Sequence, residues 1–133
     1  MPNQTVTRFI ETDKSPEAVL SVLREPANIT QWAPVFADTM ERIDGQRYQV
    51  RKGEERFIVE VQVYEPAGCV NYIREMAEGN RGGAFLRVMP RPRGGSAVTM
   101  TVPVGPTTTE DKVAKVVSDE LNELVRMARE ATG

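Results

Sequence analysis

The 133-residue sequence contains no histidine and only one cysteine, Cys69. Without histidine the chain has neither a serine–histidine nor a cysteine–histidine catalytic pair, and it lacks the commonest metal ligand in proteins. A single cysteine excludes an intrachain disulfide framework, and no histidine is present to activate the thiol. We therefore interpret Cys69 as structural and expect neither a metal nor another cofactor.

The sequence also has little net charge and no long apolar run. Its 17 basic and 19 acidic residues give a net charge of −2, which provides no overall attraction to nucleic acid or to an anionic membrane. No apolar stretch approaches the ~18 residues of a membrane-spanning helix, and the amino terminus has no charged-then-apolar signal pattern. These absences predict a cytoplasmic protein with no nucleic-acid partner and no integral membrane association. We expect a single domain over residues 1–133, as a monomer or homodimer.

Residues 107–131 have the pattern of one long amphipathic helix. Apolar residues recur at three- and four-residue spacings, at Val113, Val116, Val117, Leu121, Leu124, Val125 and Ala128. Charged residues fall mostly between them, at Lys112, Lys115, Asp119, Glu120, Glu123 and Arg126. The threonines at 107–109, followed by Glu110 and Asp111, offer more than one N-cap register. A helix of this length needs a broad partner surface.

The first third of the chain predicts a strand followed by two short helices. Residues 5–11 mix β-branched and aromatic residues with polar ones, which favours a strand. Ser15 is a good N-cap for a helix of two or three turns that Pro26 ends. Residues 28–34 fit a second short helix or turn that carries the only tryptophan, Trp32, toward the interior.

Between residues 38 and 104 the apolar period changes to two, and turn residues interrupt the chain at regular intervals. The pattern predicts an antiparallel meander of six strands, at residues 39–43, 47–51, 56–64, 69–76, 84–89 and 96–104. The glycine-rich residues 79–83 precede a strand rather than a helix, so we interpret them as a plain turn and not as a phosphate-binding loop. The apolar face of this sheet must be buried, and the C-terminal helix is the available cover.

The turn at residues 65–68 sets the register of two predicted strands. If it pairs Val63 with Val70, then Val61 faces Tyr72, Val59 faces Arg74, and Phe57 faces Met76. This register places Tyr72 and Arg74 among apolar residues. Either a bulge or the sheet edge brings the Arg74 head to solvent, or Tyr72 and Arg74 anchor the polar end of a ligand. For the predicted strand at 84–89 the sequence does not decide which face points inward. One face carries Phe85, Arg87 and Met89, and the other carries Leu86 and Val88.

Several segments, taken in order, resemble a known family. Residues 15–19 (SPEAV) resemble its Pro-x-x-x-Val helix opening, and residues 25–35 (EPANITQWAPV) are similar to its Asp-Pro-x-x-hydrophobic-x-x-Trp-x-Pro segment. Residues 63–66 (VYEP) and 94–99 (GGSAVT) resemble a strand end and the final strand of the same family. Together they resemble the START-like (SRPBCC) superfamily, also called the polyketide cyclase/dehydrase and lipid-transport or helix-grip group.

This resemblance implies an α+β helix-grip fold, in which a curved antiparallel sheet of about seven strands wraps around the C-terminal helix. The expected order is a strand, two helices, six strands and the long helix. The resemblance also implies a pocket between the sheet and the helix for an apolar or amphipathic small molecule. We predict polar anchoring by Tyr72 and Arg74, and an apolar wall formed by Trp32, Phe57, Phe85, Met89, Met100, Leu121 and Val125.

The resemblance does not fix a reaction, because family members include carriers, receptors and enzymes. The leading hypothesis is binding or transport of a lipid-, polyketide- or quinone-like molecule. The first alternative is a polyketide cyclase or dehydratase-type enzyme, which a strongly perturbed acid in the pocket would favour. The second is a protein-interaction module whose pocket is filled by its own side chains.

Overall fold

The computed structural model describes residues 4–75, 81–105 and 108–131. Its elements, in chain order, are β1 (Thr5–Thr12), α1 (Pro16–Arg24), η1 (Pro26–Asn28), α2 (Ile29–Trp32), β2 (Thr39–Asp44), β3 (Arg47–Lys52), β4 (Glu55–Tyr64), η2 (Glu65–Ala67), β5 (Cys69–Glu75), β6 (Arg81–Pro90), β7 (Ser96–Pro103) and α3 (Glu110–Ala131). The short elements η1 and η2 are single 3₁₀ turns. The predicted order of a strand, two short helices, six strands and a long helix is confirmed.

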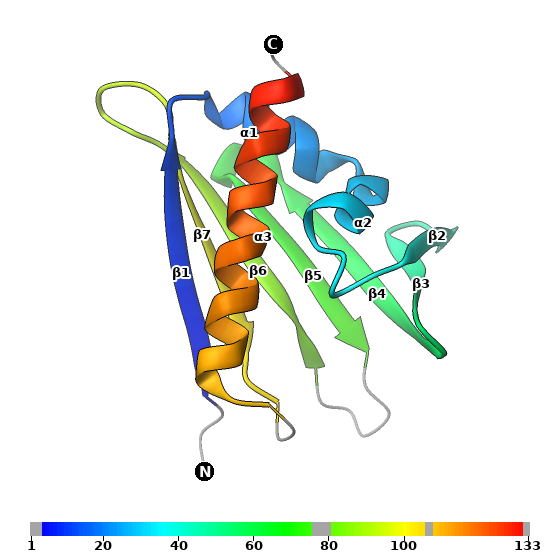
Figure 1. Ribbon diagram of the computed structural model, residues 1–133. Helices are drawn as coiled ribbons and strands as arrows, with labels where there is room; N and C mark the ends of the chain where they lie inside the picture. The colour runs from blue at the N-terminus through cyan, green and yellow to red at the C-terminus, as the bar shows by residue number, and fades with distance from the viewer. Residues whose placement is uncertain (1–3, 76–80, 106–107, 132–133) are drawn as a thin grey trace.

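The strands form one antiparallel sheet in the order β1-β7-β6-β5-β4-β3-β2. Figure 1 shows the curved sheet with α3 running along one of its faces, and α1 lying at the carboxyl end of α3. Helix α3 packs on β1 and β7 and also contacts α1 and α2. The predicted helix-grip architecture, a curved sheet around a C-terminal helix, is therefore confirmed.

Side-chain caps fix where the two main helices begin. The Ser15 hydroxyl accepts a hydrogen bond from the Ala18 amide at 3.2 Å, which starts α1 as predicted. In α3 the Thr109 hydroxyl accepts from the Lys112 amide at 3.3 Å. Of the three consecutive threonines Thr109 is thus the cap, and the helix begins at Glu110 rather than at residue 107.

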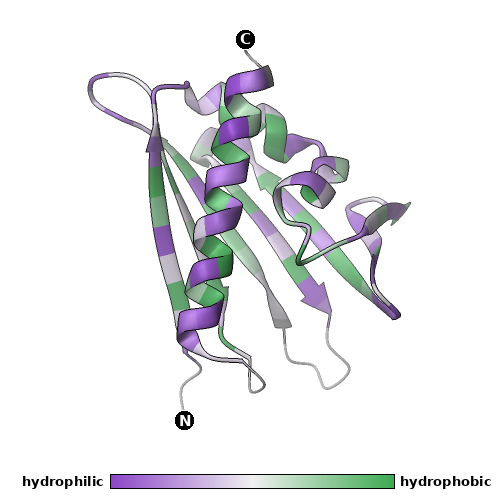
Figure 2. Ribbon diagram, viewed as in Figure 1, coloured by the Kyte–Doolittle hydropathy of each residue, from purple (hydrophilic) through white to green (hydrophobic). Residues whose placement is uncertain are grey.

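The core is a continuous apolar cluster between the sheet and the helices. Figure 2 shows hydrophilic colours along the outer side of α3, as expected for an amphipathic helix that covers a sheet. The cluster includes Val19, Leu23, Val70, Leu86, Val98, Leu121 and Leu124, all buried. Trp32 also belongs to it, which confirms that the second short helix carries the tryptophan inward.

The pairing of β4 with β5 confirms the predicted register. Val63 pairs with Val70, Val61 with Tyr72 and Val59 with Arg74, without a bulge. The expected partner of Phe57, Met76, lies outside the described residues.

Strand β6 begins earlier than predicted. It starts at Arg81, so Gly82 and Gly83 are strand residues paired with β5, and the expectation of a turn across them is wrong. Positions 79 and 80 of the predicted turn lie outside the described residues. Glycine is uncommon within strands and marks places where another backbone approaches closely.

Candidate functional site

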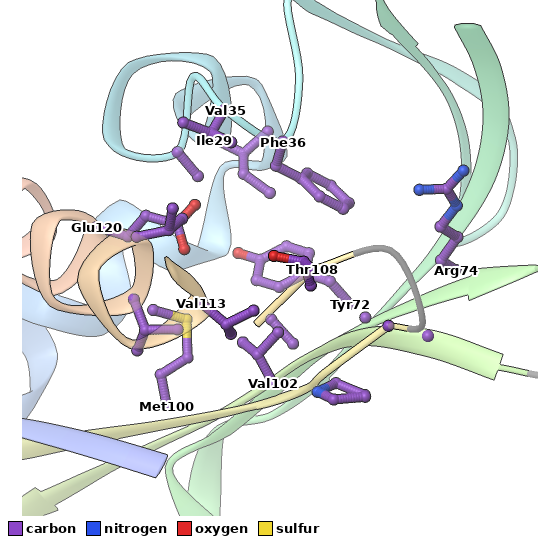
Figure 3. Close-up of a pocket in the computed structure, with 18 of the residues that line it drawn as sticks. Ile29, Val35, Phe36, Tyr72, Arg74, Met100, Val102, Thr108, Val113 and Glu120 are labelled. Carbon is purple, nitrogen blue, oxygen red and sulfur yellow. The ribbon is translucent and has the colours of Figure 1, made fainter. Parts of the chain in front are cut away.

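A cavity of about 480 Å³ lies between the amino-terminal half of α3 and the sheet. Its walls come from α2 and the loop after it, from β5, β6 and β7, and from α3 (Figure 3). The lining is mainly apolar and includes Ile29, Phe36, Met100, Val102, Val113 and Val116. The protein-interaction hypothesis assumed that the protein's own side chains fill the pocket. At this end of the interior they do not.

Two glycines in β6 help to leave this space open. Gly82 pairs with Arg74 and Gly83 pairs with Ile73, so β6 presents no side chain beside them. At Gly83, which has φ of +139°, an added Cβ would lie 1.8 Å from the backbone oxygen of Tyr72. Only glycine fits this close approach of β6 to β5.

Arg74 points from β5 toward the cavity and is held by its neighbours on β4. Its guanidinium carbon lies 3.9 Å from the ring centroid of Phe57, and one of its nitrogens lies 3.7 Å from a carboxylate oxygen of Glu55. The side chain is 34% exposed, so its head contacts both the cavity and solvent. The continuous pairing excludes an outward turn by a bulge, and the head reaches solvent at the end of the sheet instead.

Phe57 stands behind Arg74 rather than in the cavity wall. Its ring meets the ring of Phe36 edge-on, with centroids 5.5 Å apart, and Phe36 does line the cavity. A guanidinium on an aromatic face is restricted in position as well as stabilised. Phe57 thus fixes Arg74 and Phe36, and the expectation that Phe57 is itself part of the wall is corrected.

Tyr72 and Trp32 both line the cavity, and both side chains are buried. The Tyr72 hydroxyl donates a long hydrogen bond, 3.4 Å, to the carbonyl of Leu23, and burial raises the pKa of the phenol above its usual range. The Trp32 ring lies 5.9 Å from the Tyr72 ring. Its indole Nε1 is buried and has no hydrogen-bond partner among the described residues. An unpaired buried donor of this kind costs about 1–3 kcal/mol.

Glu120 is the functional candidate that the sequence analysis missed. It projects from α3 into the cavity and is only 9% exposed. Burial, with a smaller contribution from the charge of Asp119, raises the pKa of its carboxyl to about 7. Within the described residues no hydrogen bond or ion pair to its carboxyl is found. A carboxyl with this pKa exchanges its proton readily near neutral pH.

A spacing signal for Glu120 was present in the sequence. Val113, Val117, Glu120 and Leu124 follow one another at intervals of four, three and four residues, which places Glu120 within the apolar stripe of α3. Grouping it with the charged residues between the apolar positions was wrong. A charged residue inside an apolar stripe is a more specific signal than the stripe itself.

The remaining predicted site residues divide into three groups. Met100 lines the cavity together with Trp32, Tyr72 and Arg74. Leu121 and Val125 are buried in the core but are not among the lining residues. Phe85 and Met89, 38% and 44% exposed, lie on the other face of β6 because Leu86 and Val88 point inward, so their place in the apolar wall is corrected.

Comparison with protein families gives a match over almost the whole chain. Residues 3–131 match the family model described as "Polyketide cyclase / dehydrase and lipid transport". A comparison with curated protein sequences finds no relative. None of the helices in the described residues is both long and apolar enough to cross a membrane.

Solved structures with the same architecture have little sequence in common with this chain. The protein MLL2253 from Mesorhizobium loti is 17% identical, with a TM-score of 0.72 over 96% of this chain and 98% of its own. Zhui aromatase/cyclase from Streptomyces sp. R1128 is 12% identical, with a TM-score of 0.68 over 99% and 97% of the two chains. A START superfamily protein from Mycobacterium smegmatis is 13% identical, with a TM-score of 0.63 over 96% and 95%. At these identities the similarity establishes the fold alone.

Proposed function

The chain belongs to the polyketide cyclase/dehydrase and lipid transport family, and from this premise we propose that it binds or carries an apolar or amphipathic small molecule in the cavity under α3. The bound molecule is lipid-, polyketide- or quinone-like. The observation that carries the proposal is the cavity itself. Its volume of about 480 Å³ and its mainly apolar lining are those of a small-molecule site.

Arg74 gives this cavity a place for an acidic group. Its guanidinium already lies on the face of Phe57, so little side-chain freedom is lost when an anion binds. Its ion pair with Glu55 is partly exposed and therefore weak, so an acidic ligand group can replace it. Under this proposal an amphipathic acid binds with its apolar body in the cavity and its carboxylate on Arg74.

Two fluorescent probes that differ in one charge test this arrangement. We expect 11-(dansylamino)undecanoic acid and its methyl ester both to bind, with the acid bound more tightly. Arg74→Gln should weaken the acid roughly tenfold and leave the ester within about twofold, because the charge-assisted contact is lost. Arg87→Gln, on the exposed face of β6, is the matched control and should change neither affinity. Equal weakening of acid and ester by Arg74→Gln contradicts the anchoring role, and no binding of either probe contradicts the proposed function.

Glu120 supports a second candidate function, an acid–base enzyme of the cyclase or dehydratase type. A general acid or base works best when its pKa lies near the working pH, and the pKa of Glu120 is raised to about 7. A soluble aromatic 1,3,5-triketone incubated with the protein separates the two functions. An enzyme produces the cyclised, dehydrated product at a rate that Glu120→Gln abolishes, whereas a carrier returns the triketone unchanged.

A further inference from the structure

The charged groups that line the cavity are divided between its mouth and its interior. Of the described residues that line it, only Arg74, Lys112 and Glu120 have charged side chains. Lys112 is exposed and the Arg74 side chain is 34% exposed, so both cations lie where the cavity opens to solvent. Glu120 is buried, and Figure 3 shows it on the opposite side of the cavity view from Arg74. The cavity therefore has a basic mouth and one carboxyl in its interior.

We propose that Glu120 determines the specificity of the inner end of the cavity: it admits an uncharged end of the bound molecule, takes up a proton from solution when that end covers it, and excludes an anionic end. This inference rests on the proposed function, because it specifies which molecules the same cavity binds. An amphipathic acid then has one orientation, with its carboxylate at Arg74 and its uncharged end beside Glu120. Binding is coupled to proton uptake by the protein even when the bound molecule carries no charge.

The position of Glu120 makes it part of the surface that a bound molecule covers. It is only 9% exposed and lines the cavity in the same stripe of α3 as Val113 and Val117. Within the described residues no hydrogen bond or ion pair to its carboxyl is found, so solvent that reaches it through the cavity is what stabilises its charged form. A molecule that fills the cavity displaces this solvent and places its own surface against Glu120.

Removing solvent from a carboxyl favours its protonated form. Burial already raises the pKa of Glu120 to about 7, and a bound molecule removes solvent that remains. The pKa of Glu120 is therefore higher in the complex than in the free protein, and binding takes up a proton at pH values between the two. The affinity for an uncharged molecule is highest below pH 7 and falls as the pH rises through the pKa of the complex.

An anionic end of the bound molecule is disfavoured at Glu120 for two reasons. It loses its hydration in a mainly apolar space, and above pH 7 it meets an ionised carboxylate where charges are little screened. Protonating one of the two carboxyls removes the repulsion, so the exclusion is strongest above pH 7. At the mouth the same anionic group meets the cation of Arg74 instead. A molecule with an acidic group at each end therefore cannot place both favourably.

The titratable groups around Glu120 are few. In the cavity lining and on the elements packed against α3 they are Tyr72 and Arg74 of β5, Lys112 of α3, Arg8 and Glu11 of β1, and Glu17 and Arg24 of α1. Helix α2 and strand β7 carry none. Asp119, next to Glu120 in the sequence, is the neighbour whose charge adds to the effect of burial. The chain has no histidine, so a proton taken up near pH 7 is assigned to Glu120.

The first test uses the uncharged dansylated methyl ester, so that a pH dependence of binding comes from the protein. We expect the ester to bind roughly five- to tenfold more weakly at about pH 8.5 than at about pH 6. Titration calorimetry at about pH 7.5 in phosphate and in Tris, which differ in their heat of ionisation, should show uptake of roughly half a proton per bound ester. Glu120→Gln should bind the ester independently of pH and without proton uptake. Glu123→Gln is the matched control and should keep both effects, since Glu123 is paired with Arg126 on the outer side of the helix.

The second test compares dodecanoic acid with dodecanedioic acid, each as a competitor of the dansylated acid at about pH 8. We expect the diacid to bind at least roughly tenfold more weakly than the monoacid. Glu120→Gln should narrow this gap roughly threefold or more, because the repulsion is removed while the cost of desolvating the second carboxylate remains. Glu123→Gln should leave the gap unchanged.

The outcomes distinguish this inference from the proposed function. If the unaltered protein binds the ester equally well at both pH values, or without proton uptake, the inference about Glu120 is wrong and the binding function stands. An undiminished gap between monoacid and diacid in Glu120→Gln overturns the exclusion of an anionic end. If neither the ester nor the dansylated acid binds at any pH, the proposed function fails and this inference fails with it.

Discussion

The two halves of α3 meet the same sheet in different ways. From Leu121 onward the helix packs directly into the core, where Leu121, Leu124, Val125 and Ala128 are at most 2% exposed. Before Leu121 the helix covers the cavity, and Val113 and Val116 are only half-buried. The periodicity of the helix is the same on both sides of this boundary, so an amphipathic pattern does not reveal whether the space beneath it is filled.

The neighbours of each half explain the difference. The nine-residue α1 lies beside the carboxyl half and fills the space under it with Val19, Val22 and Leu23. Beside the amino half lies the single turn of α2, and β6 presents Gly82 and Gly83 to the cavity. One half therefore stabilises the fold, and the other half is available for binding. This division of α3 has consequences for stability, pH dependence and binding that can be measured.

The largest effect is expected from removing a side chain in the filled half. Leu124→Ala should lower the free energy of unfolding by about 3–4 kcal/mol, because Leu124 is fully buried and its neighbours cannot collapse into the gap. Val113→Ala in the cavity half should lower it by less than about 1 kcal/mol, since its neighbourhood is already open. Urea denaturation of both variants measures the contrast. Equal losses would show that the two halves are packed alike.

The second effect is a pH dependence that belongs to the cavity half. The carboxyl of Glu120 has a pKa of about 7 in the folded protein, compared with an ordinary value of 4.5. The folded state thus holds its proton more tightly, and the resulting stabilisation is complete below pH 4.5 and is lost as the pH rises through 7. We expect the unaltered protein to lose about 2–3 kcal/mol relative to Glu120→Gln over this range.

Denaturation curves at several pH values measure this difference. Glu123→Gln serves as the control for removing a glutamate from α3, because its carboxylate pairs with Arg126 on the exposed side. A difference between the unaltered protein and Glu120→Gln that stays constant with pH would contradict the raised pKa. A difference that grows with rising pH, to the advantage of Glu120→Gln, would confirm it.

Adding volume should again destabilise the filled half of α3 more than the half that covers the cavity. Val125→Phe forces a larger ring into the filled half and should destabilise the protein by about 1–3 kcal/mol. Val116→Phe places the same ring in the cavity and should change stability by less than about 1 kcal/mol. The same Val116→Phe variant should bind the dansylated acid at least tenfold more weakly. Undiminished binding would mean that the probe lies outside the cavity.

The parts of the structure that depend on local rules were predictable from the sequence. The Ser15 cap, the strand pattern and the β4–β5 register all follow from residues a few positions apart. That register also placed Tyr72 and Arg74 on the inner face, where both line the cavity. Short-range interactions dominate these features, so no knowledge of the tertiary structure was needed.

The remaining features depend on distant contacts. The face of β6 could not be assigned because the β5–β6 connection did not define a register, and the inward residues are Leu86 and Val88 rather than Phe85 and Met89. The role of Glu120 depends on where α3 lies over the sheet, although its place in the apolar stripe was visible. The cavity itself results from the short α2 and the glycines of β6, and its volume is a property of the assembled fold.

The smallest effect concerns the caps of the helices that define the two halves. Ser15→Ala removes the acceptor of the Ala18 amide at the start of α1 and should lower the free energy of unfolding by about 1 kcal/mol. Thr109→Ala removes the corresponding acceptor of the exposed Lys112 amide at the start of α3. Because the amide of Lys112 can bond to water instead, we expect a loss of only about 0.5 kcal/mol.

Hydrogen exchange locates these small losses. In Ser15→Ala the amides of α1 should exchange roughly fivefold faster, and those in the carboxyl half of α3 should follow, because α1 fills the space beneath that half. In Thr109→Ala the acceleration should stay within the first turn of α3. If both caps loosen the whole of α3 equally, the helix responds as one unit, and the division into a stabilising half and a binding half does not extend to its dynamics.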